Sequence, residues 1–134
     1  MRVLKLAWAA PCSAIGLLLG AIVLLLGGRA RWRAGAWEFS PTETGRFSRL
    51  AIAHLPFGAI TFGHVVIGAS CSQLVVLRQH ERVHVRQYEM LGPLFLLAYP
   101  LASLVAAMRG MPAYRGNWFE VQAYRAQSAH DAVH

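Results

Sequence analysis

The segment Cys71–Leu91, C-S-Q-L-V-V-L-R-Q-H-E-R-V-H-V-R-Q-Y-E-M-L, holds the motif H-E-x-x-H at positions 80 to 84. Ser70 and Gln73 just before and inside it have the spacing of a helical capping box. Gly92 and Pro93 follow directly, and this pair is typical of a helix end, because Gly suits the left-handed cap and Pro cannot continue the helix. We therefore predict one helix from Cys71 to Leu91.

Two histidines of this helix have the spacing of a metal site. Residues four apart lie above one another on a helix, so His80 and His84 can offer two imidazole nitrogens to one ion. Glu81 would flank that ion, and in a zinc hydrolase a glutamate so placed takes a proton from the metal-activated water. The same letters also arise by chance, and paired surface histidines on a helix are common, so this interpretation needs a third ligand.

The third ligand has to come from outside the motif, because a catalytic zinc usually takes three protein ligands. Glu89 is on the motif helix but turned off the histidine face. We favour Glu120, at the start of a helix expected from Trp118 to about Ser128. Asn117 can cap that helix, which would also allow the Glu120 carboxylate merely to bond back to the cap. His64, just before the motif helix, is the other candidate ligand.

The composition indicates a membrane protein. Hydrophobic residues make up 56% of the 134 and charged residues 14%, whereas soluble proteins average about 45–50% and 25%. Leu6 to Gly28 is an uncharged run long enough to cross a hydrocarbon core of about 30 Å. Arginines follow it, with no small-residue cleavage site, so we predict a retained transmembrane anchor rather than a signal peptide. Gly16 and Gly20 would also suit a helix dimer.

The net charge of +7 bears on the partners and the orientation of the anchor. The arginines are scattered rather than interleaved with stacking aromatics, which favours the anionic lipid bilayer as partner and no nucleic acid. More basic residues follow the anchor than precede it, and this slightly favours a cytoplasmic C-terminal domain. We expect a membrane protein with a single N-terminal anchor, and the resemblance described below implies the bacterial inner membrane.

The other segments predict a small β element and further helices. Ala36–Phe39 alternates like a short strand, and Phe57–Gly68 is expected to be extended, with its glycines marking a turn or bulge. Phe47–Leu55 is expected to be a short helix ending before Pro56.

The second uncharged run, Pro93–Met108, is too short for a comfortable span. Pro100 should kink it, so a buried or interfacial helix is favoured over a crossing one. Crossing would also put Glu120 and His80 on opposite sides of the membrane.

These expectations give a fold class and a domain division. The fold is predicted to be mainly α with a small β element: an N-terminal transmembrane helix, then a compact helical core with a short strand pair. Residues 1–33 form the anchor and its basic flank, residues 34–128 the metal-binding domain, and residues 129–134 a tail.

Two stretches carry a resemblance to known proteins. The motif at 80–84, followed by the carboxylate in N-W-F-E-V-Q-A at 117–123, resembles the zincin metallopeptidases of the gluzincin type. The wider strings G-H-V-V at 63–66 and H-E-R-V-H-V-R-Q-Y-E with G-P-L-F at 80–95 are similar to short bacterial membrane-anchored proteins. The resemblance implies a zincin-like core, Zn²⁺ held by His80, His84 and Glu120, and Glu81 as general base. It also implies that the segment Gly63–Ile67 is an edge that pairs with substrate.

Other roles stay open in the sequence. Tyr114, Tyr88 and His64 are candidates for stabilising an oxyanion, and Gln87 is either a partner of a metal ligand or a plain polar surface residue. The function we expect is a membrane-anchored zinc-dependent hydrolase, most simply a metallopeptidase acting on a peptide or protein. The alternative is a non-catalytic membrane protein in which H-E-x-x-H is a structural or vestigial metal site or a partner-binding helix. A third possibility is a membrane-surface adaptor without metal.

Overall fold

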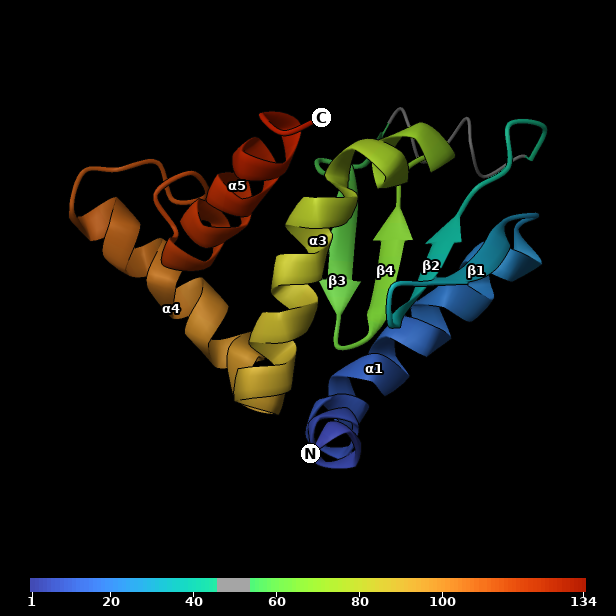
Figure 1. The fold of residues 1–134 in the computed structure, drawn as a ribbon, viewed down its shortest axis with the longest axis horizontal. Coiled ribbons are helices and arrows are strands. Elements are labelled where there is room, and N and C mark those ends of the chain that lie inside the picture. Colours follow the sequence, from blue (N-terminus) through green and yellow to red (C-terminus); the bar gives the residue numbers. More distant parts are fainter. Residues whose placement is uncertain (46–53) are drawn as a thin grey trace.

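The computed structural model describes residues 1–45 and 54–134 and shows a mainly helical chain with a four-stranded sheet (Figure 1). The short helix expected at Phe47–Leu55 lies, except for its last two residues, outside the described part. The elements in chain order are α1 (Arg2–Leu25), β1 (Arg29–Arg33), β2 (Ala36–Ser40), β3 (Ala59–Phe62), β4 (Val65–Gly68), α3 (Cys71–Leu91), a 3₁₀ turn η1 (Gly92–Leu94), α4 (Phe95–Met108) and α5 (Trp118–Asp131).

The sheet is larger than the strand pair that the sequence predicts. Its order is β1-β2-β4-β3, with two antiparallel hairpins joined by a parallel pairing of β2 with β4. The strand β1 falls in the stretch expected as a basic flank. Gly63 has φ of 60° at the turn from β3 to β4, as expected for a turn within Phe57–Gly68.

The position of β4 corrects one expectation. Val65–Gly68 is paired on both sides and fully buried, so the segment Gly63–Ile67 is not a sheet edge that could pair with substrate. The outer strands are β1 and β3, and β3 is the one beside the motif helix. A β-strand that is free along one side keeps unpaired N–H and C=O groups for another chain.

Alternation along the strands builds three layers, with α1 on one face of the sheet and α3 on the other. Val65 of β4 and Phe39 of β2 pack with Val23 of α1. Val66, one residue further along β4, packs instead with Leu74 and Val85 of α3. This is the period of two that a strand buried on both faces requires.

Small residues bring α1 close to the sheet. Gly16 and Gly20 are buried, and a Cβ at Gly16 would lie 2.6 Å from Cβ of Val65. A Cβ at Gly20 would lie 2.7 Å from the Phe39 ring. The G-x-x-x-G pattern is thus used for packing within the chain, on the face that a helix dimer would need.

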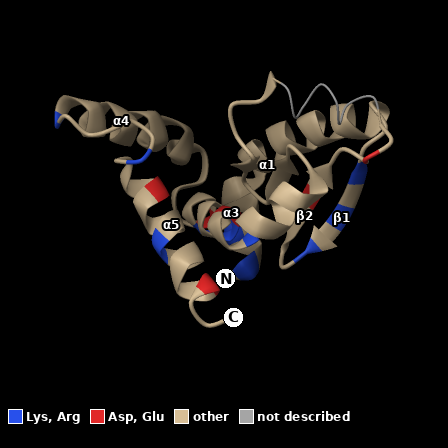
Figure 2. Ribbon diagram, turned by 90° about the horizontal axis from the view of Figure 1, so that it is seen from above, with Lys and Arg blue, Asp and Glu red and all other residues tan. Residues whose placement is uncertain are grey.

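The outer side of α1 is exposed and apolar. Two helical stretches of the described chain, Arg2–Leu25 and the continuous Cys71–Met108, are long and apolar enough to cross a membrane, a test that a signal sequence also passes. In the second stretch the charged residues lie in α3, and the apolar part is η1 and α4. Figure 2 shows the charges gathered on β1, α3 and α5 and along little of α1 and α4.

The helix α4 buries Phe95 and Ala106 but leaves most of its large apolar side chains exposed. Leu97, for example, is 72% exposed, so of the two expected states the buried one is wrong. The chain then turns back into α5 (Figure 1). Asn117, which is fully buried, holds this return: its Nδ2 donates to the Tyr99 carbonyl (3.0 Å) and Ser103 Oγ (2.8 Å).

Candidate metal centre

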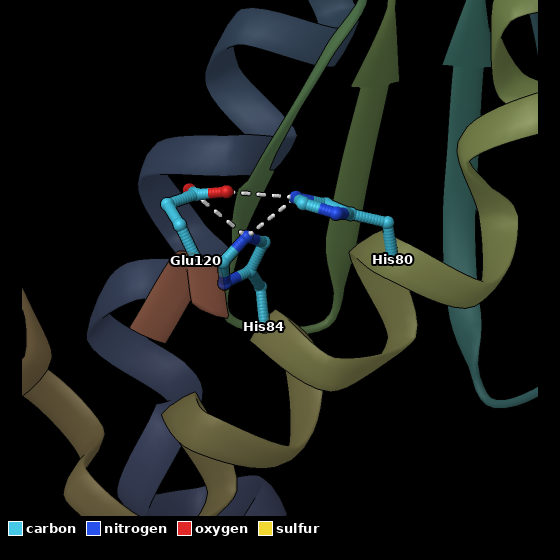
Figure 3. Close-up of side chains that lie close together, drawn as sticks. All are labelled: His80, His84 and Glu120. Carbon is cyan, nitrogen blue, oxygen red and sulfur yellow. Dashed lines mark hydrogen bonds and ion pairs between the residues drawn. The ribbon is translucent and has the colours of Figure 1, made fainter. Parts of the chain in front are cut away.

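The residues His80, His84 and Glu120 meet at one point between α3 and α5 (Figure 3). The two histidine Nε2 atoms are 3.2 Å apart. The Glu120 carboxylate reaches both, with Oε2 2.9 Å from His80 Nε2 and Oε1 3.2 Å from His84 Nε2. All three residues are buried, and their donor atoms lie within 4.8 Å of one another.

These spacings fit a small divalent cation. Zinc bonds of about 2.0–2.1 Å in a tetrahedron place neighbouring donor atoms roughly 3.3 Å apart. The three distances found here, 2.9 to 3.2 Å, are close to that value. Oε2 of Glu120 is also buried, and its ion-pair contact with His80 Nε2 is its single polar contact within the described residues, so it keeps a lone pair for an ion. The group can therefore hold a metal ion, although two imidazoles and a carboxylate suit several transition metals besides zinc.

The structure does not show the alternative role of Glu120, in which its carboxylate bonds back to the cap of α5. Asn117 caps α5 as expected, with its Oδ1 accepting from the Phe119 N–H at 2.9 Å. The Glu120 carboxylate points instead to the two histidines, and its Oε1 also accepts a 2.6 Å hydrogen bond from the Tyr99 hydroxyl. Tyr99 of α4 thus fixes the orientation of Glu120.

The other candidate ligand, His64, is elsewhere. Its Nε2 lies 3.0 Å from Oε1 of Glu89, and both residues line a different cavity. The structure therefore brings together the three residues favoured from the sequence and leaves His64 and Glu89 out of the group.

Gln87 determines the tautomer of His84. Its Oε1 lies 2.8 Å from His84 Nδ1, so that nitrogen carries the proton and Nε2 keeps its lone pair for a metal. The Gln87 amide nitrogen donates to the Phe119 carbonyl (3.2 Å) and to Gln122 Oε1 (3.0 Å). Gln87 is only 4% exposed, so the plain surface role is wrong, and its side chain ties α3 to α5.

Glu81 lies beside the three donors and is not one of them. It is buried, and its Oε2 accepts a 2.6 Å hydrogen bond from the Thr61 hydroxyl on β3. Burial raises the pKa of the Glu81 carboxyl, against the lowering effects of the nearby His84 and of the Thr61 hydrogen bond. A carboxylate with a raised pKa is a better proton acceptor near neutral pH.

The ligand side chains shift one another's pKa values. Burial alone would raise the pKa of Glu120, but the His80 and His84 imidazoles and the Tyr99 hydroxyl hold it well below its usual range. Burial would lower the pKa of His84, yet the carboxylates of Glu120 and Glu81 leave it raised. The site thus keeps Glu120 ionised, which is the form that binds a cation.

A cavity of about 560 Å³ opens over the site. Its walls come from β3, α3 and α4, and most of them are apolar or aromatic, including Phe57, Ile60 and Phe95. Tyr88 and Tyr114, two of the candidate oxyanion stabilisers, line this cavity with Glu81. The third candidate, His64, does not.

Sequence reasoning missed the residues that support the site from other elements. Thr61 holds Glu81, Tyr99 holds Glu120, and the amide of Asn117 anchors α5 to α4. A polar residue within an apolar segment was the available signal, since Thr61 and Tyr99 each interrupt such a run.

Comparisons of the chain with protein-family models, with curated proteins and with solved structures gave no match. Functional inference therefore rests on the geometry of the site.

Proposed function

We propose that this chain is a membrane-anchored, zinc-dependent hydrolase, and specifically a metallopeptidase resembling the gluzincins. One observation carries the proposal: the donor atoms of His80, His84 and Glu120 meet beside the carboxylate of Glu81, at the floor of an apolar cavity. Two histidines, a glutamate and a separate basic carboxylate are the groups that hydrolysis at a zinc site needs.

Each side chain has a defined task in this proposal. A bound zinc would supply Lewis-acid polarisation of the scissile carbonyl and lower the pKa of the attacking water. Glu81 takes the proton of that water and later gives it to the leaving amine. Thr61 keeps the Glu81 carboxylate in place through the 2.6 Å hydrogen bond. Gln87 and Tyr99 keep His84 and Glu120 in the orientations that bind.

The cavity supports a peptide as the substrate. The strand β3, an outer strand of the sheet, contributes Ala59, Ile60, Thr61 and Phe62 to the cavity wall. An extended chain can pair with such a strand through its backbone, and the aromatic walls favour apolar side chains next to the cleaved bond.

The helix α1 supports attachment to a membrane. Its outer side exposes large apolar side chains such as Leu18, Ile22 and Leu25, while its inner side is packed on the sheet. The metal site is therefore carried close to the bilayer, on the domain that α1 itself helps to form.

Metal analysis of the purified full-length protein tests the first step. We expect about one zinc per chain in the wild type and in His64→Ala, and loss of the metal in Glu120→Ala. Wild type without a stoichiometric metal, or equal metal in both variants, would refute the proposed ligand set.

Hydrolysis is tested separately with Glu81→Gln, which should retain zinc and lose peptide cleavage. The second candidate function is a non-catalytic metal protein, and the near-complete burial of His80 and Glu120 favours it, as structural sites are closed. If Glu81→Gln binds metal as the wild type does and the two proteins do not differ in any activity, the second function is supported.

A further inference from the structure

A second cavity lies on the opposite side of α3 from the metal centre. Its volume is about 300 Å³, and it is lined by Arg2, Arg82, Arg86, His64 and Glu89, among others. At 100° per residue along a helix, Arg82 and Arg86 face about half a turn away from His80 and His84. The cavity therefore shares the helix with the metal centre and shares no lining residue with it.

Four segments far apart in the sequence meet at this cavity. Arg2 comes from the start of α1, His64 from the turn between β3 and β4, and Arg82 and Arg86 from α3. The turn between β1 and β2 closes the fourth side with Ala34 and Gly35. Ala34 has φ of 53°, a conformation that alanine rarely adopts, and it is the one such non-glycine residue in the described chain.

The charges in this cavity do not balance. No ion pair is formed by Arg2, Arg82 or Arg86 within the described residues. The single carboxylate, Glu89, is already contacted by His64 (3.0 Å) and by Lys5 (3.7 Å). Three guanidinium groups thus surround one cavity without a carboxylate partner among the described residues, and this arrangement favours the entry of an anion.

The side chain of His64 is an independent indication that a ligand binds in this cavity. It is 7% exposed, and while its Nε2 contacts Glu89, its Nδ1 is buried without a hydrogen-bond partner. Buried polar atoms in folded proteins almost always have a partner. The Nδ1 atom of His64 therefore lacks a polar partner that a ligand in the cavity can supply.

We propose that the cavity formed by Arg2, His64, Arg82 and Arg86 binds a phosphate group. Guanidinium groups bind phosphate oxygens through two parallel hydrogen bonds, and a cavity of this volume admits a phosphate with a small substituent. The half-exposed ring of Trp32 lines the same cavity beside α1, whose outer side is apolar. The phosphate belongs either to a lipid headgroup or to a soluble compound, and the site does not depend on the proposed hydrolase activity.

The test uses the full-length protein in a detergent with an uncharged sugar headgroup. One arm titrates inorganic phosphate by calorimetry, and the other titrates mixed micelles that contain phosphatidylglycerol. Wild type is compared with the double variant R82Q/R86Q and with R109Q/R125Q, which loses two exposed arginines outside the cavity. Replacing each cavity arginine by glutamine should weaken phosphate binding about tenfold, because its charge-assisted hydrogen bonds are lost.

Saturable phosphate binding that R82Q/R86Q weakens and R109Q/R125Q leaves unchanged supports the proposal with a soluble ligand. The same pattern only with phosphatidylglycerol supports it with a lipid headgroup. No binding by wild type in either arm, or equal weakening in both double variants, overturns it. If R82Q/R86Q fails to fold, Arg86→Gln alone decides, because that side chain is exposed, and binding as tight as in wild type refutes the site.

Discussion

The change Gln87→Leu gives the sharpest test of how α3 and α5 build the metal centre. Leucine nearly keeps the volume of the side chain and removes all three of its hydrogen bonds, to His84, to the Phe119 carbonyl and to Gln122. At about 1 kcal/mol for each buried bond, the free energy of unfolding of the metal-free protein should fall by about 3 kcal/mol. Metal affinity should fall about 10–100-fold, because His84 loses the acceptor that fixes its tautomer.

Two measurements on the same samples separate these effects. Urea unfolding of the chelator-treated protein gives the stability, and competition with a calibrated chelator gives the metal affinity. Gln79→Leu is the matched control, since Gln79 is on the same helix and its side chain makes no hydrogen bond within the described residues. The reasoning is refuted if Gln87→Leu binds metal within twofold of wild type while Gln79→Leu behaves the same.

Three further predictions concern the supporting residues. Thr61→Val removes a hydrogen bond that lowers the pKa of Glu81, so the acidic limb of the pH–rate profile should move to higher pH with metal content unchanged; a move to lower pH would show that Thr61 acts otherwise. Asn117→Ala breaks the three hydrogen bonds of the buried Asn117 side chain, so the free energy of unfolding should fall by about 3 kcal/mol and metal binding should weaken. Unchanged metal binding would mean that α5 packs against α4 without these bonds. Gly16→Val should cost about 1–3 kcal/mol by crowding the sheet, measured by unfolding in detergent, whereas Ala14→Val on the exposed side should change it by less than about 0.5 kcal/mol; equal effects would argue against the packing described for α1.

Local signals predicted the motif helix correctly, and nonlocal contacts limited the rest. The ends of α3 follow from Ser70, whose Oγ accepts from the Gln73 N–H at 3.1 Å, and from Gly92, with φ of 56°. The strand β1 could not be predicted from the sequence, because its arginines are equally typical of the basic flank of a membrane helix. Its hairpin also turns at Ala34, which is not a usual residue for a positive φ.

The three donor residues were named from the sequence, but the sequence could not predict that their donor atoms lie close together. Spacing places Glu120 equally well as a helix-capping residue or as a ligand. The choice depends on α5 folding back along α4, and that is fixed by the bonds of Asn117 to Tyr99 and Ser103. Likewise, β4 is interior because it pairs with β2, about 28 positions earlier in the chain, which no local pattern reveals.

The close fit of α1 on the sheet gives this helix two apolar sides, one packed in the folded core and one exposed. The glycine side of α1 covers Val65 and Phe39, so a chain cut after residue 28 would expose them to water. Its leucine side needs lipid or another apolar cover at the same time. Because α1 precedes β4 and α3 in the chain, its inner side can be buried only after those elements have been synthesised. The helix α1 is thus part of the folded core, and any removal of α1 after folding would uncover the sheet face opposite α3, the helix that carries His80 and His84.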